Sequence, residues 1–291
     1  MGVIQVKATV DKSTVFLLNS DVYYEYYKHP NKENRPVIIM IHGFLSSSYC
    51  FRKMVSLLQK DFNCLLIDLP GFGRSGKKRD FHYSFENYAT LVLTLAKLLH
   101  INQAMLLGHS MGGQVALYMA SQSPQFVHSL ILLNSSAYLK KVKKAYYYAT
   151  YFPFAPQIMR WWMAKKNYRE TIEQVVFNRK MISNQIVKEY SRPFLDKEFY
   201  HSLLYLMRDR EGDLTKEQLK TIKHPALILW GENDQIIPLH IGRKLSVDLP
   251  HNQFYSFKKT GHLLPEERPK EIVKYVHRFF NDIISKESTL K

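Results

Sequence analysis

The feature of this sequence that most constrains its fold is a repeated alternation between short apolar runs and segments of helical spacing. Each run is continuous and rich in branched residues, which is typical of a strand buried on both faces of a parallel sheet. Strands that alternate with helices indicate βαβ crossovers and a mostly parallel sheet with helices on both faces. The six runs are PVIIMIHGF (36–44), FNCLLIDLPG (62–71), QAMLLGHS (103–110), VHSLILLNSS (127–136), PALILWGEND (225–234) and NQFYSFKKTGH (252–262).

The segments around these runs complete the predicted core. Residues 3–10 and 13–27 favour two further short strands, with a turn at residues 19–21, which makes eight strands in all. With 291 residues, the chain is long enough for one large α/β domain or two small ones. Apolar residues recur at helical spacing near residues 47–59, 84–100, 111–122, 239–248 and 265–285.

One long segment interrupts the alternation. Between Ala137 and about Gly212 no buried-strand run occurs, and this segment holds 16 of the 39 aromatic residues. We interpret residues 137–212 as a helical cap (lid) over one edge of the sheet, and residues 1–136 and 213–291 as the core. The cap is expected to turn its aromatic side chains inward and its lysines toward solvent.

A candidate nucleophile lies in the segment Gly108–Gly113, which reads GHSMGG. The segment follows an apolar run and opens a helix, which is the strand–turn–helix setting of the G-x-S-x-G motif. Gly108 and Gly112 permit the tight turn, because a Cβ there would strike neighbouring backbone. The turn lifts the Ser110 hydroxyl above the sheet, beside the free backbone N–H groups of a helix N-terminus. Ser110 is therefore the predicted nucleophile.

A serine nucleophile needs a base, and the base needs an acid that orients it. No Asp or Glu occurs between Asn87 and Arg169, so neither the helix after Ser110 nor the next strand supplies the acid. The following apolar run ends with Glu232 and Asp234, at the same edge of the sheet as the nucleophile. Asp234 is the predicted acid, Glu232 is the alternative, and a purely capping role for Asp234 is the third interpretation.

The predicted base is His262. Of the twelve histidines, it alone lies just past the end of a run in the C-terminal part, with the final helix after it. His42 and His109 lie inside turn motifs, where a histidine often forms a hydrogen bond with the backbone. His224 and His251 precede strands and face the opposite edge of the sheet.

An oxyanion formed at the nucleophile would need two backbone donors. The N–H of Met111, directly after Ser110, is one predicted donor. The other is the N–H of Phe44, in the loop after the run 36–42, with the Phe44 side chain on the floor of the pocket.

With these motifs in place, the chain resembles the α/β-hydrolase superfamily over nearly its whole length. Ser110, Asp234 and His262 follow the order of that superfamily. The chain is similar to small capped bacterial serine esterases and to carbon–carbon bond hydrolases that share the Ser-Met-Gly-Gly turn. The motifs that carry the resemblance are His42-Gly43-Phe44, Asp68–Ser75, Gly108–Gly113, Gly231–Asp234 and Gly261-His262.

The resemblance implies an α/β-hydrolase fold and acyl transfer to water through an acyl-serine, without a cofactor. Ser110 would attack, His262 would move the proton, and Asp234 would hold the imidazole. A serine at position 110 excludes the aspartate-nucleophile branches, haloalkane dehalogenases and epoxide hydrolases. Carbon–carbon hydrolases typically carry Trp where this chain has Leu263, which favours a carboxylesterase or lipase-like enzyme. The alternatives are a carbon–carbon bond or lactone hydrolase, and a triad-retaining ligand receptor with slow turnover.

Other classes of function have weaker support. Residues 71–76 match G-x-G-x-x-G, but the next helix starts only near Ser84 and no acid follows at the spacing of a dinucleotide site, so we interpret them as a turn. No C-x-x-C, H-x-x-x-H or H-E-x-x-H spacing predicts a metal site. Lysines and tyrosines mix at residues 140–148, as in some single-strand nucleic-acid sites, but a cap explains them as well. We predict no nucleic-acid partner.

The net charge of +16 is concentrated in the predicted cap, where fifteen Lys and Arg stand against seven Asp and Glu. This charge could recruit anionic substrates, contact an anionic membrane surface weakly, or simply face solvent. The aromatic cap predicts a small apolar acyl or aryl ester as substrate. The oligomeric state is not predicted.

Several features together predict a cytoplasmic protein. No apolar stretch approaches the roughly 18 residues of a membrane span, and the N-terminal residues do not resemble a secretory signal. Cys50 and Cys64 are too few for a disulfide framework, and Cys64 is expected to be a buried thiol.

Overall fold

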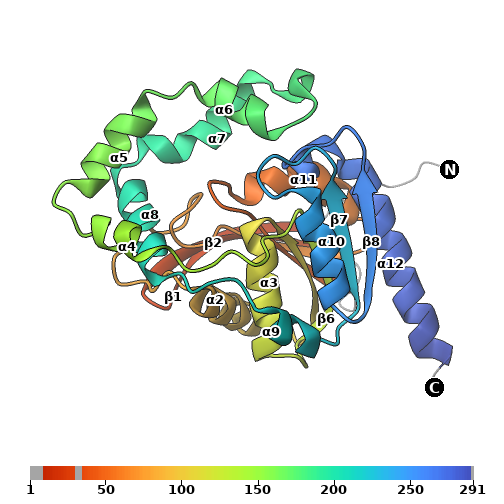
Figure 1. The fold of residues 1–291 in the computed structure, drawn as a ribbon. Coiled ribbons are helices and arrows are strands. Elements are labelled where there is room, and N and C mark those ends of the chain that lie inside the picture. Colours follow the sequence, from red (N-terminus) through yellow and green to blue (C-terminus); the bar gives the residue numbers. More distant parts are fainter. Residues whose placement is uncertain (1–8, 30–34, 290–291) are drawn as a thin grey trace.

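The centre of the protein, described by a computed structural model for residues 9–29 and 35–289, is a single eight-stranded sheet (Figure 1). In space the strands follow the order β1-β2-β4-β3-β5-β6-β7-β8. Only the pairs β1–β2 and β2–β4 are antiparallel. The predicted eight-stranded, mostly parallel sheet is confirmed. Its strands are β1 (Thr9–Leu17), β2 (Ser20–Lys28), β3 (Val37–Ile41), β4 (Asn63–Ile67), β5 (Ala104–His109), β6 (Val127–Leu133), β7 (Ala226–Gly231) and β8 (Asn252–Phe257).

The N-terminal hairpin differs from its prediction in detail. Strand β1 runs without interruption to Leu17, and Leu17 pairs with Ser20 across a two-residue turn. Leu18 and Asn19 both have positive φ angles, of 45° and 63°, which suits the right-handed twist of a tight hairpin. The predicted gap at residues 11–12 is therefore wrong, because polar residues are tolerated on an exposed edge strand. Residues 3–8 lie outside the described residues.

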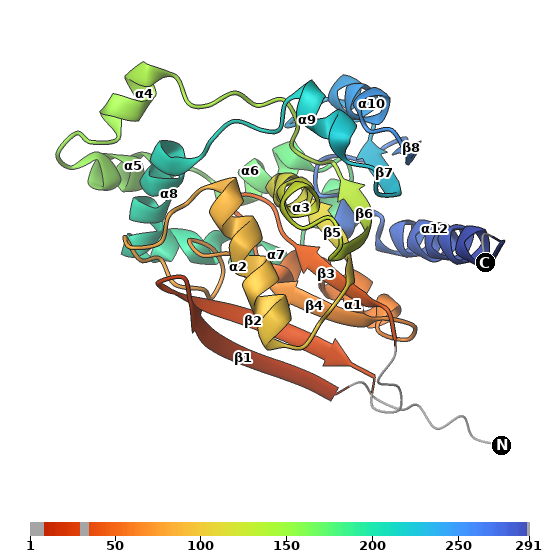
Figure 2. The same ribbon diagram turned by 90° about the horizontal axis from the view of Figure 1, so that it is seen from below.

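Helices cover both faces of the sheet (Figures 1 and 2). In the described residues, no helix is long and apolar enough to cross a membrane. One face carries α2 (Phe85–Leu98), α3 (Met111–Gln122), α9 (Lys216–Thr221) and α10 (Leu239–Asp248), and the other carries η1 (Ser48–Phe51), α1 (Arg52–Leu58), α11 (Leu264–Glu267) and α12 (Pro269–Thr289).

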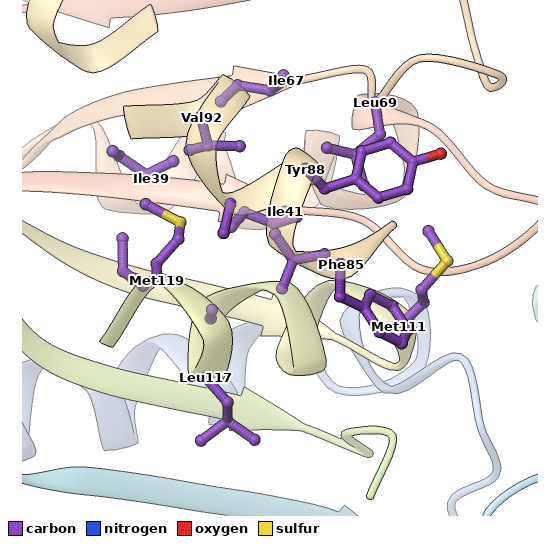
Figure 3. Close-up of a cluster of buried hydrophobic side chains, with 14 of the residues drawn as sticks. Ile39, Ile41, Ile67, Leu69, Phe85, Tyr88, Val92, Met111, Leu117 and Met119 are labelled. Carbon is purple, nitrogen blue, oxygen red and sulfur yellow. The ribbon is translucent and has the colours of Figure 1, made fainter. Parts of the chain in front are cut away.

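The core explains why β3 is a continuous apolar run. Ile39 and Ile41 face α2, where Phe85, Tyr88 and Val92 belong to the same buried cluster (Figure 3). The alternate residues of the strand, Ile38 and Met40, belong instead to the buried cluster of α1 and α12. Both faces of the strand are buried, so polar residues have no place in it.

The two cysteines are free thiols, and both are buried. Cys64 lies within β4, so its predicted burial is confirmed. Burial raises the pKa of both thiols well above the usual range, which keeps them protonated.

Between β6 and α9 the chain forms helices and no strand, as the sequence indicates. The segment 137–212, here called the insertion, lies beside and above the sheet in Figure 1. It is anchored by α8, whose Phe199, Leu203 and Leu206 join the buried cluster of α2 and α3. The division into core and cap domains at residues 137 and 212 stays a prediction. The helices are α4 (Lys144–Ala149), α5 (Ala155–Ala164), α6 (Tyr168–Val175), η2 (Arg179–Met181), α7 (Asn184–Ser191), η3 (Arg192–Leu195) and α8 (Lys197–Asp209).

The prediction that the insertion turns its aromatic side chains inward is wrong for α4 and α5. Neither helix has a buried residue. Met159 and Met163 of α5 pack against the core cluster, and α5 lies against α8, so the remaining large side chains face outward. More than half of each of these side chains is exposed, and together they form what we call the aromatic patch: Tyr146, Tyr148, Tyr151, Phe152, Phe154, Ile158, Trp161 and Trp162.

Candidate active site

Ser110 occupies a strained turn between β5 and α3. Its backbone lies at φ 52° and ψ −119°, a conformation that residues with a side chain rarely adopt. A Cβ at Gly112 would overlap the Ile41 carbonyl oxygen, and one at Gly108 would overlap the backbone of Gly112 itself. The turn therefore requires glycine at both positions, as the sequence predicts.

The structure brings together the three side chains that the sequence analysis selected. The Ser110 hydroxyl lies 3.0 Å from His262 Nε2, and His262 Nδ1 lies 2.8 Å from Asp234 Oδ2. All three residues are buried. They follow the ends of β5, β8 and β7, because the carboxyl ends of parallel strands meet at one edge of the sheet.

Asp234 is held in its charged form. Burial alone would raise its pKa, but the hydrogen bond and charge of His262 and the N–H groups of Ile237 and Ile236 outweigh burial, and the pKa is lowered. These two N–H groups donate to Oδ1 at 2.9 and 2.7 Å. Glu232, the alternative acid, accepts a hydrogen bond from Ser256 on β8 at 2.8 Å and forms no hydrogen bond with His262.

Asn134 contributes to the site, although the sequence analysis did not predict it. Its amide nitrogen donates to Asp234 Oδ2 and, at 3.2 Å, to the Gly261 carbonyl, while its oxygen accepts from the Gly231 N–H at 3.0 Å. One side chain thus ties together the loops that carry Asp234 and His262. Its signal in the sequence is an asparagine at the end of the apolar run 127–136, where the sequence analysis looked only for a carboxylate.

A second missed residue, Glu267, joins the loop of His262 to the insertion. Its carboxylate accepts from the Gly261 N–H at 2.7 Å and from the N–H groups of Phe177 and Asn178 at 2.9 and 3.0 Å. The backbone N–H of His262 also donates to the Val175 carbonyl at 2.7 Å. The position of the histidine therefore depends on the segment after α6.

Among the residues that the structure describes, two backbone N–H groups near Ser110 have no protein acceptor. Met111 is the first residue of α3, where an N–H has no partner within the helix. Among the described residues, the Phe44 N–H likewise has no acceptor. The loop of Phe44 is close to the nucleophile, because a Cβ on Gly43 would lie 2.9 Å from the Ser110 Cβ. The oxyanion hole at Phe44 and Met111 stays a prediction.

His42 and His109 form hydrogen bonds with the backbone, as the sequence indicates. The Leu69 N–H donates to His42 Nε2 at 3.0 Å, so Nδ1 carries the proton and donates to the Gly43 carbonyl at 2.8 Å. This pair of bonds holds the loop that precedes Phe44. His109 Nε2 lies 2.8 Å from the His262 carbonyl oxygen, and its Nδ1 is buried without a partner in the described residues.

The buried His109 should make the folded state sensitive to acid. Burial, followed by the nearby His262, lowers the pKa of His109 to about 3. Between pH 6.5 and about 3 the unfolded chain therefore binds a proton that the folded chain does not bind. Stability falls with decreasing pH in that window, by about 1.4 kcal/mol per pH unit for such a group.

We therefore expect the unfolding free energy of His109→Gln to fall less steeply with decreasing pH than that of the wild type. From pH 6.5 to 4.5, the variant should lose about 2 kcal/mol less unfolding free energy than the wild type, because the unfolded histidine is only half protonated at pH 6.5. Urea unfolding at a series of pH values measures this difference. His251→Gln, at an exposed position, should leave the slope unchanged, and equal slopes for wild type and His109→Gln would contradict the assignment.

An apolar cavity of about 510 Å³ lies beside the nucleophile. Its walls come from the Phe44 loop, the start of the insertion, α8 and the segment before α10, and Arg210 and His240 add two basic groups. Phe44 lines this cavity, as expected. The lining residues are Phe44, Phe85, Ser110, Met111, Ser136, Ala137, Tyr138, Leu139, Val142, Leu206, Met207, Arg210, Ile236, Ile237, Pro238, His240 and Ile241.

The loop at residues 71–76 is a structural turn, as interpreted from the sequence. Gly71 and Gly73 have φ angles of 91° and 52°, and α2 begins only at Phe85. The Arg74 N–H donates to the buried Asp68 carboxylate at 2.8 Å, which fixes the turn. Within the described ranges, no group of three or more His, Cys, Asp or Glu side chains is placed to hold a metal ion.

The fold and the geometry at Ser110 define the class of protein. A family model described as alpha/beta hydrolase fold matches residues 36–269. The chain belongs to this family and is a hydrolase of the α/β fold.

Similar proteins agree with this assignment. The hydrolase YugF of Bacillus subtilis is 40% identical over 259 residues, which cover 89% of this chain and 94% of that protein. The pimeloyl-[acyl-carrier protein] methyl ester esterase of Vibrio atlanticus is 27% identical over 237 residues, covering 78% and 87% of the two chains. The structure of the enol-lactonase of Burkholderia xenovorans superposes with a TM-score of 0.76 at 20% identity, covering 92% of this chain and all of that one.

Proposed function

We propose that the protein is a serine hydrolase that cleaves carboxylic esters with an apolar acyl or aryl group. The observation that carries the proposal is the hydrogen-bonded series Ser110–His262–Asp234, whose serine opens into an apolar cavity. The reaction needs no cofactor or metal, because the base, the orienting acid and the backbone donors all belong to the chain.

In the first half of the reaction, His262 Nε2 takes the Ser110 proton as Oγ attacks the ester carbonyl. The charge that develops on the carbonyl oxygen is stabilised by the N–H groups of Phe44 and Met111. The imidazolium is stabilised by the charged Asp234 carboxylate, 2.8 Å from Nδ1. His262 then gives its proton to the leaving alcohol, and the acyl group stays on Ser110.

In the second half, water takes the place of the alcohol. His262 removes a proton from water, the hydroxide attacks the acyl-serine, and the proton returns to Ser110 Oγ as the carboxylic acid leaves. The apolar cavity beside Ser110 would hold the acyl or aryl group through both halves of the reaction.

Ester hydrolysis is favoured over carbon–carbon hydrolysis by the surroundings of Leu263. The side chain packs into a small apolar cluster with Ile172, Val176, Ile182 and Ile186 of the insertion. It does not line the cavity beside Ser110. The esterase among the similar proteins is consistent with this preference, whereas the enol-lactonase keeps lactones among the substrates worth testing.

A substrate panel tests the proposal. It contains p-nitrophenyl esters of graded acyl length, aryl esters, a lactone and a carbon–carbon cleavage substrate. We expect rapid turnover of apolar esters. Fast cleavage of only the lactone, or of only the carbon–carbon bond, would show that this reaction and not ester hydrolysis is the activity of the protein. Slow turnover of every compound, with tight binding of one, would show that the protein is a ligand receptor and not an enzyme.

A variant that fills the cavity should separate long from short substrates. Met207 of α8 lines the cavity and is only partly exposed. Met207→Trp should lower kcat/KM for long acyl esters by about tenfold or more, because the larger side chain occupies the space of the acyl chain. Hydrolysis of the acetate ester by the same variant is the internal control. An equal loss of kcat/KM for all acyl chain lengths would show that the acyl group binds outside this cavity.

A further inference from the structure

The outer face of α4 and α5 exposes many large apolar side chains, which is unusual for the surface of a single folded chain. The aromatic patch extends through α4, the turn after it and α5, and Phe154, Phe152 and Trp161 are exposed to 69%, 63% and 62%. In Figure 1 both helices lie at the outer edge of the molecule, away from the sheet. Exposed apolar surface of this kind marks a contact site more often than a solvated face.

The segment that carries the aromatic patch has charge of one sign. No acidic residue occurs between Tyr138 and Arg169, whereas four lysines lie within residues 140–144 and Arg160, Lys165 and Lys166 accompany α5. All seven cationic residues are exposed. A surface that combines exposed aromatic rings with lysines matches the interface of an anionic bilayer, where rings lie at headgroup level and lysines meet phosphates.

The geometry of α5 fits this role. The Lys165 ammonium lies 3.3 Å from the centre of the Trp161 ring, and Lys166 lies 3.9 Å from the centre of the Trp162 ring. Each tryptophan therefore has its own lysine four residues later on the same side of the helix. At a lipid surface these ammonium groups can contact phosphates while the rings enter the interface.

The segment that leads into α4 lines the cavity beside the nucleophile. Leu139 and Val142, which line that cavity, lie five and two residues before α4. A lipid layer bound at α4 would thus lie near one wall of the cavity that holds Ser110. This link depends on the proposed function, but binding of the patch to lipid does not.

Two other occupants fit less well. A second copy of the chain would bring seven cationic groups against seven more, with no acidic residue of the patch to pair them. A single-stranded nucleic acid would match the charge and the rings, but not the aliphatic Ile158 and Leu139 or the link to an apolar cavity.

We propose that the outer face of α4 and α5 docks the protein onto an anionic lipid surface. Phe154, Trp161 and Trp162 enter the interface, while Lys165 and Lys166 bind lipid phosphates. The attraction is electrostatic and apolar together, so it weakens with salt and is small on uncharged lipid.

The chain contains its own spectroscopic probe. Of its three tryptophans, Trp230 is fully buried, and its Nε1–H donates to the Ile237 carbonyl at 2.9 Å. A change in tryptophan emission on addition of lipid therefore reports Trp161 and Trp162. We expect a blue shift with phosphatidylglycerol/phosphatidylcholine vesicles at low salt, and little shift with phosphatidylcholine vesicles alone.

Co-sedimentation with the same vesicles measures the partition coefficient of the variants. Lys165→Ala/Lys166→Ala should lower it about 25-fold, at roughly fivefold per lysine, and Trp161→Ala/Trp162→Ala about tenfold or more. The matched control Lys270→Ala/Lys274→Ala removes two exposed lysines of α12 and should change it less than twofold. Phe16→Ala removes an exposed ring on β1 and should have no effect.

Either of two results would overturn the proposal. One is the absence of both an emission shift and sedimentation with anionic vesicles, and the other is an equal loss of partition coefficient for the α5 and α12 lysine pairs. A blue shift that appears with protein concentration alone would assign the patch to self-association. A shift with an oligonucleotide but not with vesicles would assign it to nucleic acid. None of these readouts requires hydrolysis, so a failure here is distinct from a failure of the proposed function.

Discussion

Ser110→Ala should lower ester hydrolysis by about 10⁶-fold and leave the fold intact. The substitution removes only the hydroxyl group. No other described residue places a hydroxyl within hydrogen-bond distance of His262 Nε2. The proposed backbone donors at Phe44 and Met111 would still polarise a carbonyl, so a small residual rate above water is expected. Steady-state hydrolysis of the best ester in the panel measures the loss.

The matched control for this variant is Ser121→Ala, which removes an exposed hydroxyl near the other end of α3. It should retain full activity. Circular dichroism and thermal unfolding should show the same fold and midpoint for wild type and both variants. Unchanged turnover in Ser110→Ala would refute the acyl-serine mechanism, whereas loss of both fold and activity would call for Ser110→Cys as a second test.

The features that the sequence predicts well are those with local causes. A strand buried on both faces must be apolar at every position, so β3 and β7 are visible as runs such as VIIMI and ALILW. The turn at Ser110 is equally local, because steric limits dictate glycine at positions 108 and 112. The order of strand ends then places Asp234 and His262 beside Ser110 without knowledge of any distance.

The features that the sequence does not predict depend on contacts between distant segments. Asn134 and Asp234 are 100 residues apart, and Glu267 meets Phe177 across 90 residues, so neither pair follows a motif. The prediction of how α4 and α5 are oriented is wrong for a related reason. Helical spacing shows that a helix has two faces, but not which of them finds a partner, and here Met159 and Met163 face the protein.

Asp234→Asn should reduce kcat by about 10⁴-fold while preserving the shape of the site. The hydrogen bonds of the carboxylate give the reason. Oδ1 accepts from the N–H groups of Ile236 and Ile237, and Oδ2 accepts from His262 Nδ1 and the Asn134 amide. An asparagine has one oxygen and one NH₂ group, and the two backbone donors will keep the oxygen.

The NH₂ group of the substituted side chain would then face His262 and Asn134, both of which are donors in the wild type. To accept from it, His262 must lose the proton on Nδ1 and carry it on Nε2, which points at the Ser110 hydroxyl. In that tautomer the histidine cannot take the serine proton, and no carboxylate stabilises an imidazolium. Glu232→Gln is the matched control, because Glu232 accepts only from Ser256 on β8 and should keep activity within about threefold. A greater loss in Glu232→Gln than in Asp234→Asn would move the acid to position 232, because only the residue that orients His262 can impose the wrong tautomer.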